Sequence, residues 1–258
     1  MPRRPRIDLA GYHHIINRGV NRTNIFSSPD DKEKFIQILC KACRIYGVVV
    51  HDYCLMDNHY HLLVENSQVN LSLFMRQINS NYAIYYNKKV KRTGHLWQGR
   101  YSSWYILKED YLYRTIRYIE YNPLEAGMSS EVGEYPYTLG SVLLGKMDMP
   151  KCCKKSMLVE QYDIETLADF LGKPLSKKEL KDLEEEKKKK ITKIKDKAVS
   201  EKIEELSSYF DVSMDKQKRN SAIVEAYNDG HTQSSIAKEI GISDAMVCMV
   251  IKKLRINT

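Results

Sequence analysis

Two apolar segments joined by a two-residue turn constrain the fold of this chain more than any other feature. The first opens with Val48-Val49-Val50 and reaches about Met56, and the second runs from His59 to Glu65. Asp57-Asn58 stands between them, and a short polar pair between two apolar runs is typical of a β-hairpin. A hairpin pairs its strands antiparallel, so we expect both strands to belong to an antiparallel sheet.

The segments on either side of the hairpin follow strand and helix patterns. In the helical segments, apolar positions recur at three- and four-residue spacing. Strand, helix, hairpin, helix, strand and helix in this order predict an α+β fold, with helices packed on one antiparallel sheet. The predicted strands cover residues 12–17, 48–56, 59–65 and 101–107; the predicted helices run from Pro29 to Gly47, over 71–87, and over 109–121, where Asn122-Pro123 stops the last one.

Changes in composition divide the chain into three parts. Residues 1–147 hold the α+β pattern and form the first predicted domain. Residues 148–214 are a predicted linker, because Lys, Glu and Asp dominate from Ser176 to about Ser208 at spacings typical of a solvated helix. Residues 215–258 form a small all-α domain.

The last part has the pattern of a helix-turn-helix. Helices are predicted over 219–229, 232–239 and 244–254, with a turn at Gly241-Ile242-Ser243 in which Ser243 caps the third helix. Lys252 and Lys253 in the last turn favour DNA as the partner. The alternative is three-helix packing without a role in DNA binding.

The composition limits the partners and the compartment. A formal net charge of +8 over 258 residues favours an anionic partner such as nucleic acid, although a merely basic protein is the alternative. No apolar run approaches the ~20 residues that a membrane span needs, so we expect no membrane partner. The six cysteines offer no second C-x-x-C pair for zinc, and we expect reduced thiols in a cytoplasmic, nucleoid-associated protein.

His59 and His61 are the first candidate site residues. Alternate residues of a strand point to one face, so both imidazoles can approach one cation while Tyr60 points to the other face. Imidazole is the commonest metal ligand in proteins, but two imidazoles are only half a site. The pair could equally be the polar face of a half-buried strand.

The predicted helix 109–121 offers groups that could complete such a site. Tyr118 and Asn122 are four residues apart and share one face with Arg114. A phenol, an amide and a guanidinium on one stripe suit an anionic phosphodiester better than a protein core. Among 18 tyrosines, Tyr111, Tyr113 and Tyr121 remain rivals of Tyr118 on spacing alone.

Several ordered motifs resemble the one-tyrosine HUH transposases, most of all the REP-associated tyrosine transposases. The motifs are Asn17-Arg18-Gly19, Tyr53-Cys-Leu-Met-Asp-Asn-His-Tyr-His-Leu-Leu-Val-Glu65, Gly94-His-Leu-Trp-Gln-Gly-Arg100, Tyr118-Ile-Glu-Tyr-Asn-Pro123 and Ala126-Gly127. The resemblance covers residues 12 to about 145. It departs from the family at Tyr60, where relatives have a hydrophobe, and in the C-terminal helix-turn-helix, which many relatives lack.

The resemblance implies a fold and a chemistry. It implies an HUH, ferredoxin-like palm in which His59, His61 and Asn122 hold Mg²⁺ or Mn²⁺ and Tyr118 is the nucleophile. It implies DNA transposition and recombination, through cleavage and rejoining of single-stranded or hairpin DNA by a 5′-phosphotyrosine intermediate. Candidate DNA contacts are Arg18, Arg22, Arg76 and Arg100 on the backbone, Trp97 stacked on a base, and Arg114 beside the tyrosine, although each could be a plain surface or packing residue.

Other functions remain open at this point. A non-catalytic regulator would use the first domain only to bind hairpins and the helix-turn-helix to bind duplex DNA. A replication or relaxase-type nickase would carry a third metal-binding histidine or paired tyrosines, and a plain nuclease would use water as its nucleophile. The target sequence stays undetermined, and so does the choice between monomer and homodimer.

Overall fold

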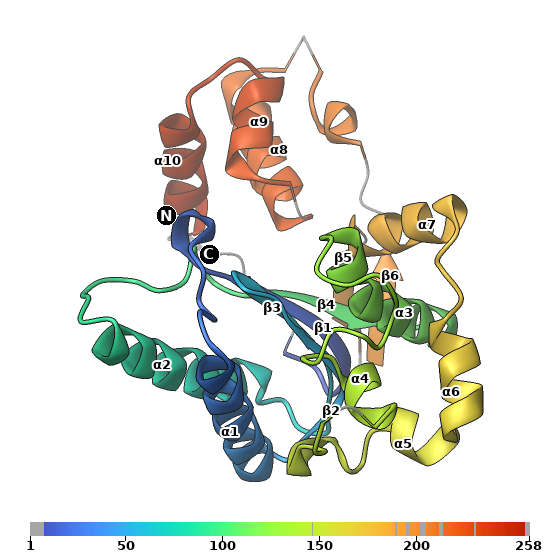
Figure 1. The fold of residues 1–258 in the computed structure, drawn as a ribbon. Helices are drawn as coiled ribbons and strands as arrows, with labels where there is room; N and C mark the ends of the chain where they lie inside the picture. The colour runs from blue at the N-terminus through green and yellow to red at the C-terminus, as the bar shows by residue number, and fades with distance from the viewer. Residues whose placement is uncertain are drawn as a thin grey trace. The chain divides into compact units, whose positions relative to one another are not determined.

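The computed structural model describes residues 8–145, 147–188, 190–194, 197–201, 205–211, 214–229 and 231–255 (Figure 1). The chain divides into two compact units. One comprises Ile7–Lys187, and the other includes Lys188–Thr258. None of the helices within the described ranges combines the length and the apolar character needed to cross a lipid bilayer.

A four-stranded antiparallel sheet forms the centre of the first unit. Its strand order is β2-β3-β1-β4, so the predicted hairpin, β2–β3, occupies one side of the sheet. In the pairing of β1 with β3, Ile16 lies opposite His61 and Arg18 lies opposite His59. The α+β fold and the hairpin are therefore confirmed. The strands are β1 (Gly11–Arg18), β2 (Val48–Leu55), β3 (His59–Asn66) and β4 (Ser102–Ile106).

Helices pack on both faces of this sheet (Figure 1). Successive side chains of β3 point to opposite faces, so they contact different helices. Tyr60 points toward α1 (Pro29–Tyr46) and α2 (Leu71–Lys89), because its ring lies 4.7 Å from that of Phe35 and its hydroxyl donates to Asn79 Oδ1 at 2.8 Å. His61 points the other way, toward α3 (Glu109–Glu125). The aromatic ring at position 60 is thus a core residue that leaves the two imidazoles on the opposite face.

Local signals explain where α1 begins and ends. Ser28 and Asp31 form a capping box around Pro29, and the Asp31 carboxylate accepts hydrogen bonds from the backbone N–H groups of Ser27 and Ser28. Gly47 ends the helix in the left-handed conformation, with φ of 67°, which glycine adopts without steric cost. The sequence predicted both ends.

The end of α3 differs from the prediction, because the helix continues through Pro123 to Glu125. A proline in a helix leaves the carbonyl four residues earlier without its backbone donor. Here the Asn122 amide donates to the Tyr118 carbonyl at 2.6 Å and reaches the Ile119 carbonyl at 3.5 Å. The side chain before the proline therefore replaces part of the lost bonding and lets one more turn form.

A pair of buried carboxyl groups joins α3 to β2. Asp52, beside an irregularity in the β2–β3 pairing, accepts from the Tyr53 N–H at 2.8 Å, and Glu120 accepts from the Gly140 N–H at 2.6 Å. Burial raises the pKa of both carboxyls, and the neighbouring Glu120 raises that of Asp52 further. Asp52 therefore binds its proton more tightly than an exposed aspartate and donates a hydrogen bond to Glu120.

The first unit extends beyond the predicted boundary at residue 147. Leu158, Leu167 and Leu183 are buried in the same core as the sheet. The segment after residue 147 is therefore packed against the first unit and is not a solvated linker. The elements between α3 and the second unit are α4 (Leu139–Leu143), α5 (Met157–Gln161), α6 (Ile164–Leu171) and α7 (Lys177–Lys188), with the 3₁₀ turn η2 (Lys151–Cys153).

The predicted helical linker is helical only as far as Lys188. It is followed by an antiparallel hairpin of β5 (Lys190–Ile194) and β6 (Lys197–Glu201). The sequence Ile191-Thr192-Lys193-Ile194 places three β-branched residues in β5, and such residues favour strands. The helical prediction relied on the charge pattern of the whole segment and did not take this local preference for a strand into account.

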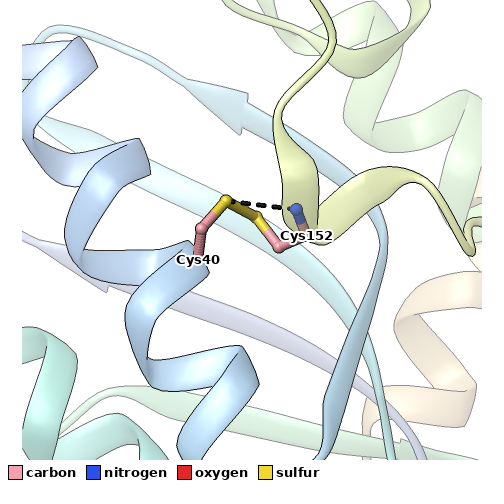
Figure 2. Close-up of a disulfide and its surroundings, with 2 residues drawn as sticks. All are labelled: Cys40 and Cys152. Atoms are coloured by element: carbon pink, nitrogen blue, oxygen red, sulfur yellow. Dashed lines mark hydrogen bonds between the residues drawn. A yellow bond between two sulfur atoms is a disulfide. The ribbon is translucent and has the colours of Figure 1, made fainter.

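A disulfide between Cys40 and Cys152 corrects the expectation that all six cysteines are reduced (Figure 2). Cys40 lies on α1 and Cys152 on η2, 112 residues later, and their Cα atoms are 4.8 Å apart. This proximity comes from the packing of η2 beside α1, which residue spacing does not reveal. Cys43, Cys54 and Cys153 remain buried thiols.

Three helices of the second unit enclose a small core of their own. Ile223, Ile236 and Val247, one from each helix, are fully buried in it. The helices confirm the three predicted from the sequence, the first beginning three residues earlier because Asp215 caps it. They are α8 (Lys216–Asn228), α9 (Gln233–Glu239) and α10 (Asp244–Arg255), preceded by the 3₁₀ turn η3 (Leu206–Tyr209).

Candidate active site

His59 and His61 lie side by side at the start of β3. Their ring centroids are 5.1 Å apart, and His61 is buried while His59 is partly exposed. The strand geometry that places residues i and i+2 on one face accounts for this arrangement. The pair therefore faces α3 together, with one ring in the interior and one toward the surface.

A second side chain holds each imidazole. His59 Nδ1 donates to Asn58 Oδ1 at 2.6 Å, which leaves Nε2 of His59 with its lone pair. His61 Nδ1 lies 3.1 Å from His14 Nε2, within hydrogen-bond distance. Such partners orient metal-binding histidines and fix which ring nitrogen carries the lone pair.

The two imidazoles meet the requirements of metal ligands. Burial lowers the pKa of His59 to about 4 and that of His61 well below its ordinary value, so both rings are neutral at pH 7. His61 Nε2 is buried without a hydrogen-bond partner among the residues that the structure describes. In the tautomer in which His61 Nδ1 donates to His14, Nε2 of His61 carries a buried lone pair that fits a bound cation.

Tyr118 comes to this pair from α3. Its ring centroid lies 5.8 Å from that of His61 and 5.9 Å from that of His14. The side chain is half-buried, and burial raises the pKa of its phenol, as do Glu125 and Glu184, while Arg18 opposes them. The phenol is thus protonated at pH 7 and needs a neighbouring positive charge to act as a nucleophile.

Asn122 follows Tyr118 by one turn of α3. Its amide nitrogen is committed to the carbonyl of Tyr118, so its oxygen is the atom that can serve as a metal ligand. Over the described ranges, no three His, Cys, Asp or Glu side chains are grouped to hold an ion. A cation on the two imidazoles would therefore need Asn122, water or substrate for its remaining positions.

Arg18 is the predicted DNA contact that lies at the site. It ends β1 opposite His59, and it is half-buried. Its positive charge lowers the pKa of His59, His61 and Tyr118, which places it near all three. Its buried Nε has no hydrogen-bond partner in the described part of the chain.

Trp97 and Arg114 already have partners within the protein. Trp97 donates from Nε1 to the Asn79 carbonyl at 3.0 Å, and its ring lies 5.7 Å from that of Tyr60, on the face of the sheet away from the histidines. Arg114 forms an ion pair with Asp182 of α7, at 3.4 Å. Arg22, Arg76 and Arg100 are exposed.

The predicted contacts of the helix-turn-helix belong to the second unit. Ser243 precedes α10 and accepts from the Met246 N–H through its side-chain oxygen at 3.3 Å, as a cap does. The backbone of Lys252 and Lys253 continues α10. Their side chains lie outside those that the structure describes.

Two residues at the site were missed in the sequence. His14 could have been found, because the antiparallel register of β1 and β3 places it on the same face as His61. Lys187 of α7 could not, because it stands in a run of lysines and glutamates without a distinguishing pattern. Its Nζ lies 4.4 Å from the ring centroid of Tyr118.

Two solved structures resemble the chain. One, described as a REP-associated tyrosine transposase bound to a REP hairpin, has 16% identity and a TM-score of 0.44, and the match covers 54% of this chain and 81% of that one. The other, a putative transposase from Deinococcus radiodurans R1, has 17% identity and a TM-score of 0.34, over 46% of this chain and 96% of that one. No curated protein matches.

A family model matches the segment that carries the site. Residues 9–122 match the family described as "Transposase IS200 like". This segment begins just before β1 and ends at Asn122, so it contains both histidines of β3 and Tyr118. Over residues 9–122, the chain is similar to the IS200-like transposases.

Proposed function

We propose that this protein cleaves and rejoins single-stranded or hairpin DNA, with Tyr118 as the nucleophile. One observation carries the proposal: Tyr118 and His61, 57 positions apart in the sequence, have ring centroids 5.8 Å apart. A transposase of the IS200-like family needs a group that breaks a DNA strand, and a tyrosine beside two neutral imidazoles provides one.

The proposed reaction exchanges one phosphoester bond for another. Tyr118 Oη forms a bond to phosphorus, the bond from phosphorus to the 3′-oxygen breaks, and the DNA is left with a 5′-phosphotyrosine and a free 3′-hydroxyl. The phenol loses its proton to water, and the leaving 3′-oxygen gains one. Because the bond energy is kept in the adduct, attack by a second 3′-hydroxyl rejoins DNA without ATP.

His59, His61 and the Asn122 oxygen would hold a divalent cation. When bound, Mg²⁺ or Mn²⁺ would neutralise charge on the phosphate oxygens, and two nitrogen ligands favour Mn²⁺ over the harder Mg²⁺. Asn58 and His14 hold the orientation of the two imidazoles that would bind the cation. Asn122 holds its position by its bond to the Tyr118 carbonyl.

In this proposal, the DNA contacts that do not take part in the reaction come from both units. Arg18 would meet the strand beside Tyr118, while Arg22, Arg76 and Arg100 are exposed cations suited to backbone phosphates. The motifs shared with REP-associated tyrosine transposases favour a hairpin as substrate. The helix-turn-helix, with Ser243 capping α10, would bind duplex DNA.

Trapping the adduct tests the proposal. The protein is incubated with Mn²⁺ and labelled single strands from the regions flanking its coding sequence, and the products are separated under denaturing conditions. A protein band carrying the label, with the label mapped to the peptide containing Tyr118, is the expected result. Cleavage without an adduct would indicate water as the nucleophile, and binding without cleavage would favour the non-catalytic regulator.

A further inference from the structure

Helix α7 is bound to α3 by two ion pairs. Arg117 of α3 binds Glu179 at 2.7 Å, and Arg114 binds Asp182 at 3.4 Å. Leu183, on the same face of α7, is 2% exposed and lies in the core of the first unit. Residues four apart share a helix face, so this contact brings Lys187 to the active site.

Lys187 lies against the candidate nucleophile. Its Nζ is 4.4 Å from the ring centroid of Tyr118 and 5.4 Å from that of Trp104, which is half-buried on β4. Its positive charge lowers the pKa of His14 and His61, so the ammonium is close to the imidazoles as well. Burial lowers the pKa of Lys187 itself.

This half-buried ammonium forms no ion pair with a carboxylate of the described residues. Arg18, on the sheet side of Tyr118, likewise has a buried Nε without a hydrogen-bond partner there. Withdrawing cations from water is costly unless an anion compensates them. Two such cations beside the Tyr118 phenol could together bind one anionic group that approaches this phenol.

We propose that Lys187 binds the phosphate attacked by Tyr118, opposite Arg18, and so is a substrate-binding residue of the site. The inference rests on the proposed function, because it is the strand cleaved by Tyr118 that supplies the phosphate. It also means that the catalytic unit needs α7, which lies beyond the family segment 9–122. The competing interpretation is a cation–π contact that only anchors α7.

Salt dependence of binding separates the two interpretations without requiring cleavage. The affinity of the full chain for a short labelled oligothymidylate is measured by anisotropy in EDTA over a range of salt concentrations. For single strands, each phosphate contact contributes about 0.7 to the slope of log affinity against log salt. Lys187→Ala is expected to reduce that slope by ~0.7.

Three further variants make the measurement specific. Lys187→Gln keeps the apolar stem against Tyr118 and Trp104 but removes the charge, so it should match Lys187→Ala. Lys187→Arg should retain the slope. Lys181→Ala removes the same charge from an exposed position on the same helix, where the side chain is 77% exposed, and should leave the slope unchanged.

Single-turnover adduct formation provides the second measurement. Lys187→Gln should slow it by about 100- to 1,000-fold, as expected when one group that stabilises transition-state charge is removed, while Lys187→Arg should restore most of the rate. An unchanged salt slope in Lys187→Ala and Lys187→Gln would overturn the proposal, and so would an equal or faster adduct rate. If the wild-type protein forms no adduct, the proposed function fails, yet the salt slope still decides whether Lys187 binds phosphate.

Discussion

The side-chain amide of Asn122 donates a hydrogen bond to the backbone carbonyl of Tyr118 at 2.6 Å. The residue proposed as a metal ligand is thus fixed to the backbone of the proposed nucleophile. Pro123 removes the backbone donor that the Ile119 carbonyl would otherwise receive, and the same Asn122 amide reaches that carbonyl at 3.5 Å. One amide therefore maintains both the last turn of α3 and the spacing within the site.

Asn122→Asp keeps an oxygen that can bind a metal but removes the donor. A carboxylate beside the Tyr118 carbonyl should lower the free energy of unfolding at pH 7 by ~1 kcal/mol and slow adduct formation. Urea denaturation and single-turnover cleavage measure the two effects. Asn87→Asp is the matched control, since its amide makes a similar bond to the Gly94 carbonyl on an exposed helix end. Equal unfolding midpoints for wild type and Asn122→Asp would contradict the assignment.

Tyr118→Phe should abolish strand cleavage and the covalent adduct while binding of hairpin DNA persists. The substitution removes only the hydroxyl, and the ring contacts with His14 and His61 remain. Tyr113→Phe, on the same helix but with its hydroxyl bound to Gln161, should retain full activity. An adduct that survives in Tyr118→Phe would move the nucleophile to another tyrosine.

Replacing both His59 and His61 by alanine should remove metal-dependent cleavage. The double variant loses both nitrogen ligands of the candidate site, whereas the proposed DNA contacts of Arg18 and the second unit are unchanged. Cleavage is measured over a series of Mn²⁺ concentrations, with oligothymidylate binding as the control for folding. Full activity of the double variant in EDTA would rule out the metal role.

Asp52→Asn should stabilise the protein at neutral pH. The folded-state pKa of Asp52 is raised, so its contribution to stability is complete below the unfolded value of 3.8 and is lost as pH rises above it. Asparagine keeps an acceptor for the Tyr53 N–H and a donor for Glu120. Because it does not titrate, its contribution to stability is not lost as pH rises. Thermal unfolding between pH 4 and 8 should show a flatter curve for Asp52→Asn than for wild type.

Asp169→Asn supplies the comparison for this pH series. Asp169 is 71% exposed and pairs with Lys173 on the surface, so its substitution should leave the pH profile unchanged. If Asp52→Asn has the same profile as Asp169→Asn, the buried carboxyl pair does not contribute in the way described.

The sequence was most informative where local geometry determines position. The alternation of β3 placed His59 and His61 on one face, and the hairpin turn made the sheet antiparallel. Four-residue spacing correctly put Tyr118 and Asn122 on successive turns of one helix. The proximity of Tyr118 to His61, however, was implied only by the resemblance of several motifs to a family, since spacing alone left three other tyrosines open.

The features that sequence reasoning missed depend on contacts between distant segments. Pro123 lies inside α3 and the Asn122 amide reaches the Ile119 carbonyl, an arrangement that a rule based on the proline alone cannot anticipate. Lys187 reaches Tyr118 because Arg117 and Glu179 bind across 62 positions of sequence. A charged segment has many possible partners, and its composition does not select among them.

The bond between Cys40 and Cys152 encloses His59, His61, Tyr118 and Asn122 in one covalent ring of chain. A protease that cuts once anywhere inside this ring would leave both halves of the site attached to each other. The nicked protein would run as one species on a non-reducing gel and separate into two fragments only after a thiol is added. Partial proteolysis can therefore map which stretches of the site are accessible without dispersing the pieces.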